Sequence, residues 1–210
     1  MNVGRIIQGA ECVAEGAAWL AAHEEGMARA LATVEEVPLR LKPDGFGELL
    51  SAIVSQQVSV ASAGAIWGRT VEAGLTSEAA VIDAGAEGLR AVGFSRPKQR
   101  YALALARAGI DYAALRETPT DEVIARLVDV PGIGLWTAEI YAMFSLGRAD
   151  VFAAGDLALQ ESARVLYGLD ERPKERAFRE MAEDWAPWRS VAARLLWAYY
   201  RVIKSREGIR

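Results

Sequence analysis

The chain has 210 residues, of which 52% are hydrophobic and 25% are charged, and its formal net charge is −4 at pH 7. This is the composition of a folded protein with one sizeable core or two small lobes, which excludes a disordered chain. The single cysteine, Cys12, excludes an internal disulfide, a four-cysteine zinc site and a cysteine-ligated iron–sulfur cluster. The single histidine, His23, excludes a multi-histidine metal site. No apolar run is long enough for a membrane span, and we expect no secretion signal.

Apolar residues recur at helical spacing over most of the chain. In chain order, this pattern predicts helices at roughly 45–57, 97–109, 119–128, 135–146 and 189–204. Alternating strand patterns with hairpin turns are nearly absent, so we predict an all-α fold. Thr118 is expected to cap a helix that begins at Pro119, and Gly147 is expected to end the helix at 135–146.

A short turn of the sequence Pro-Gly-Ile-Gly, residues 131–134, joins two of the predicted helices. Its glycines permit positive φ angles and a bare backbone that a ligand can approach closely. The second helix begins at this turn and directs unpaired N–H groups outward, an arrangement that suits a phosphate. By its spacing alone, the turn is equally compatible with a tight helix–helix connection whose glycines serve geometry only.

Four further segments accompany this hairpin, namely 53–60 with its two glutamines, 93–98, 150–156 and 187–190. In this order along the chain, the five segments resemble the helix-hairpin-helix (HhH-GPD) DNA glycosylase superfamily, and within it the alkylbase branch of the bacterial 3-methyladenine DNA glycosylase II type. The resemblance implies two packed helical lobes with a central cleft. One lobe would comprise residues 44–148, with the helix-hairpin-helix motif at about 119–146, and the other residues 1–43 and 149–210.

Asp156 matches the essential aspartate of the superfamily, in the pair Gly155-Asp156 after the hairpin. Cleavage of an N-glycosidic bond builds positive charge on the sugar, which a fixed carboxylate stabilises while it orients or deprotonates the attacking water. Asp156 also precedes a helical pattern and so fits a helix N-cap, a role compatible with catalysis. We interpret Asp150, which matches the same pattern, as structural.

Trp136 stands where strand-cutting members of the superfamily carry a lysine that forms a Schiff base. The resemblance therefore implies an enzyme that uses water, releases only the base and lacks AP-lyase activity. With Tyr141 and Trp197, Trp136 is expected to form a base pocket in which aromatic faces stack on an extruded base. Core packing is the alternative for Trp136 and Trp197. Ile140 replaces an aromatic residue that is common in the branch, which leaves the shape of the pocket open.

The resemblance also implies a set of DNA-binding residues. Gln56 and Gln57 would enter the duplex where the damaged nucleotide is extruded. The alternative is that they are solvent-facing amides at a helix end. The hairpin contributes Val130, Gly132, Gly134 and Thr137. Positive charge gathers locally in two runs, which are otherwise typical of solvated faces: Arg96, Lys98, Arg100 and Arg107, and Arg201, Lys204, Arg206 and Arg210.

These features predict a monofunctional DNA glycosylase that hydrolyses the N-glycosidic bond of alkylated bases in base-excision repair. Alternatives are a glycosylase for neutral lesions such as uracil, a non-catalytic helix-hairpin-helix DNA-binding module, and a helical protein-interaction domain. We expect a monomer in the bacterial cytoplasm, bound to damaged double-stranded DNA and not to a membrane. We expect no cofactor and no metal at the active site, and the hairpin leaves room for a monovalent cation.

Overall fold

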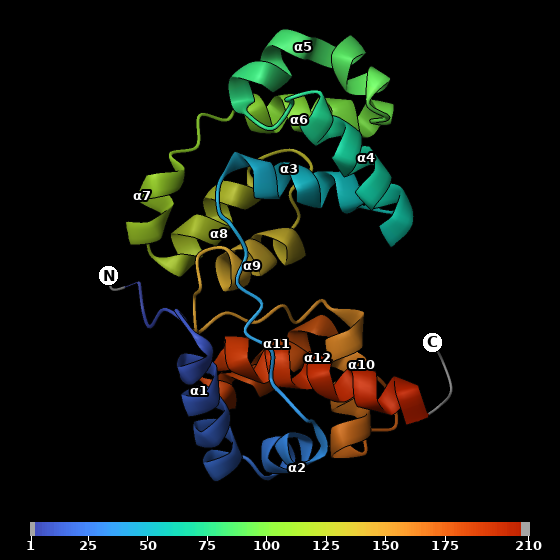
Figure 1. Ribbon diagram of the computed structural model, residues 1–210. Helices are drawn as coiled ribbons and strands as arrows, with labels where there is room; N and C mark the ends of the chain where they lie inside the picture. Colours follow the sequence, from blue (N-terminus) through green and yellow to red (C-terminus); the bar gives the residue numbers. More distant parts are fainter. Residues whose placement is uncertain (1–2, 207–210) are drawn as a thin grey trace. The chain divides into compact units, whose positions relative to one another are not determined.

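The computed structural model describes residues 3–206. Over this range the chain is helical and contains no strand, only one isolated bridge between Ile6 and Arg148, so the all-α prediction is confirmed. None of the described helices is both long and apolar enough to cross a bilayer. Figure 1 shows the α-helices in chain order: α1 Ala10–His23, α2 Glu25–Thr33, α3 Phe46–Ser55, α4 Val60–Glu72, α5 Glu78–Ala91, α6 Arg96–Arg107, α7 Tyr112–Glu117, α8 Thr120–Val128, α9 Leu135–Phe144, α10 Leu157–Tyr167, α11 Glu175–Met181 and α12 Arg189–Arg206. A 3₁₀ helix, η1 Ala182–Trp185, follows α11 in the chain.

The chain divides into two compact units. The first is the continuous segment Lys42–Tyr141, and the second combines the residues up to Leu41 with those from Ala142 onward. The chain thus leaves the second unit after its first two helices and returns to it within α9. We describe each unit separately.

In the first unit, α6 packs against both α3 and α5, and α3 also packs against α4. The apolar stripe that predicts α3 is fully buried, since Leu49, Leu50, Ile53 and Val54 have no exposed surface. Val123 and Leu127 of α8 are buried in the same way, one turn apart on one helix face. Helical periodicity therefore identified these core faces correctly.

Two polar residues of the first unit differ from their predicted roles. Thr118 does not cap α8, which begins at Thr120 without a side-chain cap; its hydroxyl donates instead to the Ala114 carbonyl, within α7. Lys98 does not belong to a solvated basic face. It is 8% exposed, its Nζ donates to the Val54 carbonyl at 2.5 Å, and burial lowers its pKa. Lys98 therefore satisfies a carbonyl in the last turn of α3.

In the second unit, α12 packs against α1, α2 and α10. Next to it, Phe152, Phe178 and Trp185 meet edge to face, with ring centroids 5.0 to 6.0 Å apart. Trp185 and Trp188 are both buried and act as packing residues. This aromatic cluster holds Phe152, which lies in the loop that leads to Asp156.

Candidate active site

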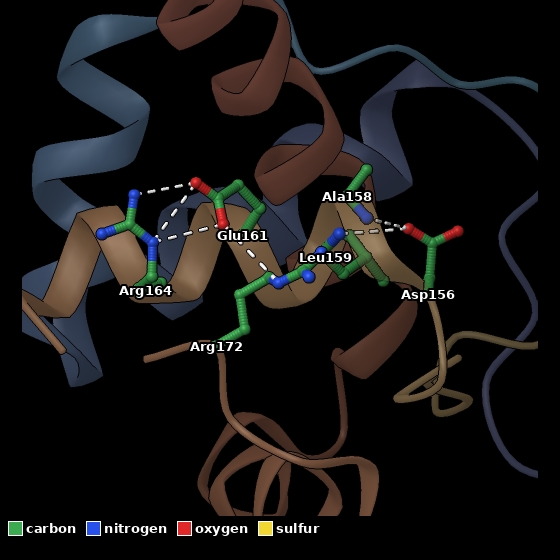
Figure 2. A network of polar contacts seen from close by, with 6 residues as sticks. All are labelled: Asp156, Ala158, Leu159, Glu161, Arg164 and Arg172. Carbon is green, nitrogen blue, oxygen red and sulfur yellow. Dashed lines mark hydrogen bonds and ion pairs between the residues drawn. The ribbon is translucent and has the colours of Figure 1, made fainter. Parts of the chain in front are cut away.

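Asp156 is the N-cap of α10, where its carboxylate meets the first backbone amides of the helix. Its Oδ1 accepts hydrogen bonds from the N–H groups of Ala158 at 2.9 Å and Leu159 at 3.0 Å. Figure 2 shows both contacts on one oxygen, while the other oxygen points away from the helix. At this position the carboxylate meets the positive end of the helix dipole and two N–H donors that would otherwise lack partners. The side chain is half-buried, so a substrate can still reach it.

Trp197, one of the predicted pocket residues, lies in contact with Asp156. Its indole Nε1 donates to Asp156 Oδ1 at 3.2 Å, and its ring centroid is 5.7 Å from that of Phe144. Three N–H donors thus converge on one carboxylate oxygen, two from α10 and one from α12. They restrict the rotation of the carboxylate, which is what a preorganised electrostatic group requires.

The loop before Asp156 is fixed at several points. Asp150 forms a two-pronged ion pair with Arg189, at 2.6 and 2.9 Å, which supports its interpretation as a structural residue. Gln160, which is buried, donates from Nε2 to the Ala154 carbonyl at 2.8 Å. Gln160 on α10 therefore fixes the backbone two residues before Asp156. The sequence did not indicate this role.

The next acidic residue on α10 is engaged in a structural contact. Glu161, one turn further along α10, accepts hydrogen bonds from Arg164, which lower its pKa and keep it ionised (Figure 2). In the first unit, Glu139 on α9 is buried, with 2% of its surface exposed. Within residues 3–206, no three histidine, cysteine or carboxylate side chains gather as a metal site would need.

In the first unit, the hairpin between α8 and α9 has two glycines with different requirements. Gly132 has a φ of +97°, and a Cβ there would lie 2.4 Å from the ring of Tyr101, so only glycine fits. Gly134 has no such constraint, because a Cβ there would meet no atom within 4 Å. The fold therefore requires glycine at position 132. At Gly134 it does not, and the space beside the Gly134 backbone is open.

The two glutamines at the end of α3 occupy different environments. Gln56 is half-buried, and its Nε2 donates to the Gly132 carbonyl at 2.8 Å, which joins the end of α3 to the hairpin. Gln57 is exposed and has a left-handed φ of +55°, an uncommon conformation for a residue other than glycine. Gln57 is therefore the more accessible of the two side chains.

The other predicted site residues of the first unit differ in how much of their surface is exposed. Trp136, in the first turn of α9, is 47% exposed and presents aromatic surface. Val130 and Thr137 are buried residues that expose little surface to a ligand. Tyr141 does not offer an aromatic face: it is 3% exposed, and its hydroxyl accepts from the Gly45 N–H at 2.8 Å. Burial is the main cause that raises the pKa of Tyr141 to about 12. Tyr141 thus packs in the interior of the first unit, and its assignment to the base pocket stays a prediction.

Comparison with known proteins agrees with these features. Residues 50–187 match the model of the HhH-GPD superfamily base excision DNA repair proteins. DNA-3-methyladenine glycosylase 1 of Schizosaccharomyces pombe is 32% identical over 178 residues, which are 80% of this chain and 78% of the relative. A structure of the S. pombe 3-methyladenine DNA glycosylase in complex with abasic DNA superposes with a TM-score of 0.75 at 31% identity, covering 87% of this chain and 95% of the other.

A second solved structure gives the same result. The DNA-3-methyladenine glycosidase of Bacillus halodurans superposes with a TM-score of 0.79 at 32% identity, over 90% of each chain. The matched family segment contains the hairpin, the Asp156 loop and α10 together. The chain belongs to the HhH-GPD superfamily of base excision DNA repair proteins.

Proposed function

We propose that this protein is a DNA glycosylase that hydrolyses the N-glycosidic bond of alkylated purines in double-stranded DNA. The observation that carries the proposal is the carboxylate of Asp156, which three N–H donors hold at the start of α10. The named relatives, which are 3-methyladenine glycosylases, support the substrate class. We further propose that the protein acts as a monomer in the bacterial cytoplasm, without a cofactor; a monovalent cation at the hairpin would assist only phosphate binding.

In the proposed reaction, the damaged nucleotide leaves the base stack and its C1′–N bond breaks. Positive charge then develops on the sugar, and the ionised Asp156 stabilises it. The same carboxylate accepts a proton from the attacking water, whose oxygen forms the new bond to C1′. The departing base takes the electron pair of the broken bond. Gln57 would occupy the space in the duplex that the extruded nucleotide leaves.

The chemistry of the leaving group supports a cationic substrate. A neutral base must gain a proton as it leaves, and this requires a general acid. Glu161, the next acidic residue after Asp156 on α10, is held ionised by Arg164. A 3-methyladenine or 7-methylguanine base already carries positive charge and leaves without an added proton. Stacking on the exposed ring of Trp136 would favour such a cation by about 0.5–2 kcal/mol.

Base release from matched duplexes tests the proposal. We expect single-turnover excision of 3-methyladenine and 7-methylguanine to be faster than excision of uracil or 8-oxoguanine. Borohydride should trap no covalent adduct with the DNA, because Trp136 has no amine to form a Schiff base. Faster release of a neutral base would contradict the substrate class. Release of no base from any duplex that the protein binds would instead identify a non-catalytic DNA-binding module.

A further inference from the structure

The turn that leads to Asp156 is closed by few hydrogen bonds of its own. The Asp156 N–H donates to the Ala153 carbonyl at 3.0 Å, and the Ala154 N–H donates to the Phe152 carbonyl at 3.1 Å. Because the turn lies outside any helix, its geometry depends on contacts from neighbouring elements. Gln160 supplies one such contact from α10. A second comes from α11, and the reaction described above makes no use of it.

Arg179 of α11 connects this turn to the helix. Its Nη1 donates to the Phe152 carbonyl at 3.3 Å, and its Nη2 donates to Glu175 Oε1 at 3.1 Å. The two acceptors use separate nitrogens of one planar guanidinium, so Glu175 orients the group that reaches the turn. Phe178, the residue before Arg179, meets the Phe152 ring edge to face. Helix α11 therefore holds both the side chain and the carbonyl of Phe152.

The second oxygen of Glu175 lies beside the backbone of Gly155, the residue before Asp156. A Cβ at position 155 would lie 3.3 Å from Glu175 Oε2, which is closer than most Cβ atoms approach a neighbour. The carboxylate therefore fits at this place because residue 155 has no side chain. Glu175 thus borders the turn directly at Gly155 and reaches it again, through Arg179, at Phe152.

The pair is too exposed to be a large source of overall stability. The side chains of Arg179 and Glu175 expose 39% and 49% of their surface, and exposed ion pairs contribute little to the free energy of unfolding. Its effect is expected to be local, on a turn that few other bonds hold. Catalytic rates depend steeply on such positions, since a displacement of about 1 Å can lower a rate about 100-fold.

We propose that Glu175 and Arg179 are positioning residues, which hold the turn at 153–156 so that the carboxylate of Asp156 meets the sugar of the extruded nucleotide. This inference rests on the proposed function, because the reaction at Asp156 is what depends on the position. Neither side chain touches DNA or the reacting atoms in this role. The inference adds α11 to α10 and α12 as a third helix that supports the site.

Single-turnover release of 7-methylguanine at saturating protein tests the pair. We expect the rate to fall about tenfold in Arg179→Gln, and about threefold in Glu175→Gln, which keeps the bond from Arg179 to Phe152. Arg179→Lys retains the charge and one donor group, so its rate should lie between those of the parent and Arg179→Gln. The dissociation constant for a duplex with a tetrahydrofuran abasic-site analogue should stay at the parent value in all three variants.

The same helix offers a matched control pair, Arg176 and Glu180. These residues are also four apart and exposed, and Arg176 Nε donates to Glu180 Oε1 at 2.9 Å. Within residues 3–206, their side chains bond to each other and not to the turn. Arg176→Gln should therefore keep the parent rate, and thermal unfolding checks that every variant is folded. A parent rate in Arg179→Gln, or an equal loss in Arg176→Gln, would overturn the proposal.

A double variant shows whether Arg179 acts through Asp156. If Arg179 only positions the carboxylate, its removal has little effect once the carboxylate is gone. We expect the double variant Asp156→Asn, Arg179→Gln to release base at the rate of Asp156→Asn alone, within about twofold. A further loss of about tenfold in the double variant would show that Arg179 acts independently of Asp156 and would overturn the positioning role.

Amide hydrogen exchange separates this proposal from the glycosylase proposal. In Arg179→Gln, the amides of residues 153–156 should exchange faster than in the parent, and in Arg176→Gln at the parent rate. If the parent releases 7-methylguanine but Arg179→Gln matches it in rate and exchange, the positioning role is wrong and the glycosylase proposal stands. If the parent releases no base but exchange rises in Arg179→Gln, the hold of Arg179 on the turn stands and the glycosylase proposal is wrong.

Discussion

At the residue scale, Asp156 combines a structural and a proposed chemical role in one side chain. As the N-cap of α10 it satisfies two amides that would otherwise lack partners. The same two bonds, with that from Trp197, fix the carboxylate that the proposed reaction needs. The helical pattern after Asp156 predicted its capping role, and the resemblance to the superfamily implied its catalytic role. The sequence could not show that Trp197, 41 residues away, donates to that carboxylate, because only the packing of α10 against α12 creates the contact.

Trp197→Phe tests whether this donor positions the carboxylate. The ring and its contact with Phe144 are largely retained, but the N–H is lost. A hydrogen bond to a charged group contributes about 1.5 kcal/mol or more, so we expect the single-turnover rate of base release to fall about tenfold or more. Trp19→Phe is the matched control, since Trp19 stacks on His23 in α1 and makes no contact with the site. An unchanged rate in Trp197→Phe would show that Trp197 only packs.

At the element scale, the two glycines of the hairpin between α8 and α9 have different roles: Gly132 is needed for the fold, and Gly134 leaves room for a ligand. Gly132 is required by its φ of +97° and by the ring of Tyr101. No atom of the described chain would clash with a side chain at Gly134, and this residue is exposed. The sequence could show that both were glycines in a tight turn. It could not separate their roles, because Tyr101 reaches the hairpin from α6.

Two substitutions in the hairpin should therefore have opposite effects. We expect Gly132→Ala to destabilise the protein by about 2–4 kcal/mol, through backbone strain and overpacking. We expect Gly134→Ala to leave stability unchanged or raise it by up to about 1 kcal/mol, and to weaken binding of duplex DNA about tenfold or more. Urea unfolding and fluorescence anisotropy measure the two effects. Parent-like DNA affinity in Gly134→Ala would contradict a phosphate contact at this backbone.

Helices with strong apolar stripes were the predictable elements of the fold. The five predicted helices correspond to α3, α6, α8, α9 and α12, with bounds within a few residues. The sequence did not identify α4 or α5, and their surfaces explain why. Only Ala63 and Thr70 are buried in α4, and Gly85, with a φ of +59°, interrupts α5. Periodicity needs a continuous buried face, and these two helices lack one.

At the scale of the whole molecule, the interior contains more polar groups than the sequence suggests. Arg194 is fully buried on three carbonyls, and Lys98 is buried on one. Both residues look like surface charges in a sequence, because burial of a cation depends on carbonyl partners that only the tertiary fold supplies. Because Lys98 is buried, the first basic cluster inferred from the sequence has less charge available to DNA than its residues suggest.

Buried tyrosines also make the stability of the protein sensitive to alkaline pH. Burial raises the pKa of Tyr112, Tyr141 and Tyr167, and that of Tyr141 to about 12. Between pH 10 and 12 the unfolded chain has lost the Tyr141 proton while the folded protein retains it, so the free energy of unfolding falls as pH rises. The ionisation of Tyr141 accounts for about 2–3 kcal/mol of this fall in the free energy of unfolding.

Urea unfolding across this pH range checks the contribution of Tyr141. We expect Tyr141→Phe to be less stable than the parent at pH 8, because the Gly45 N–H loses its acceptor, and to lose less stability between pH 10 and 12. Thr33→Val, which removes an exposed hydroxyl bonded within α2, should keep the slope of the parent. A Tyr141→Phe variant with the same slope as the parent would show that this tyrosine ionises at its ordinary pKa.

The central claim is that Asp156 drives the release of alkylated purines. Its most direct test is the single-turnover rate of 7-methylguanine release by the parent and by Asp156→Asn, with DNA affinity and thermal unfolding measured beside it. Asparagine caps a helix about as well as aspartate, so we expect stability to change by less than about 0.5 kcal/mol. It cannot balance positive charge on the sugar, so the account predicts a rate lower by about 100-fold or more, with DNA binding retained. Release by Asp156→Asn at the rate of the parent would contradict the account.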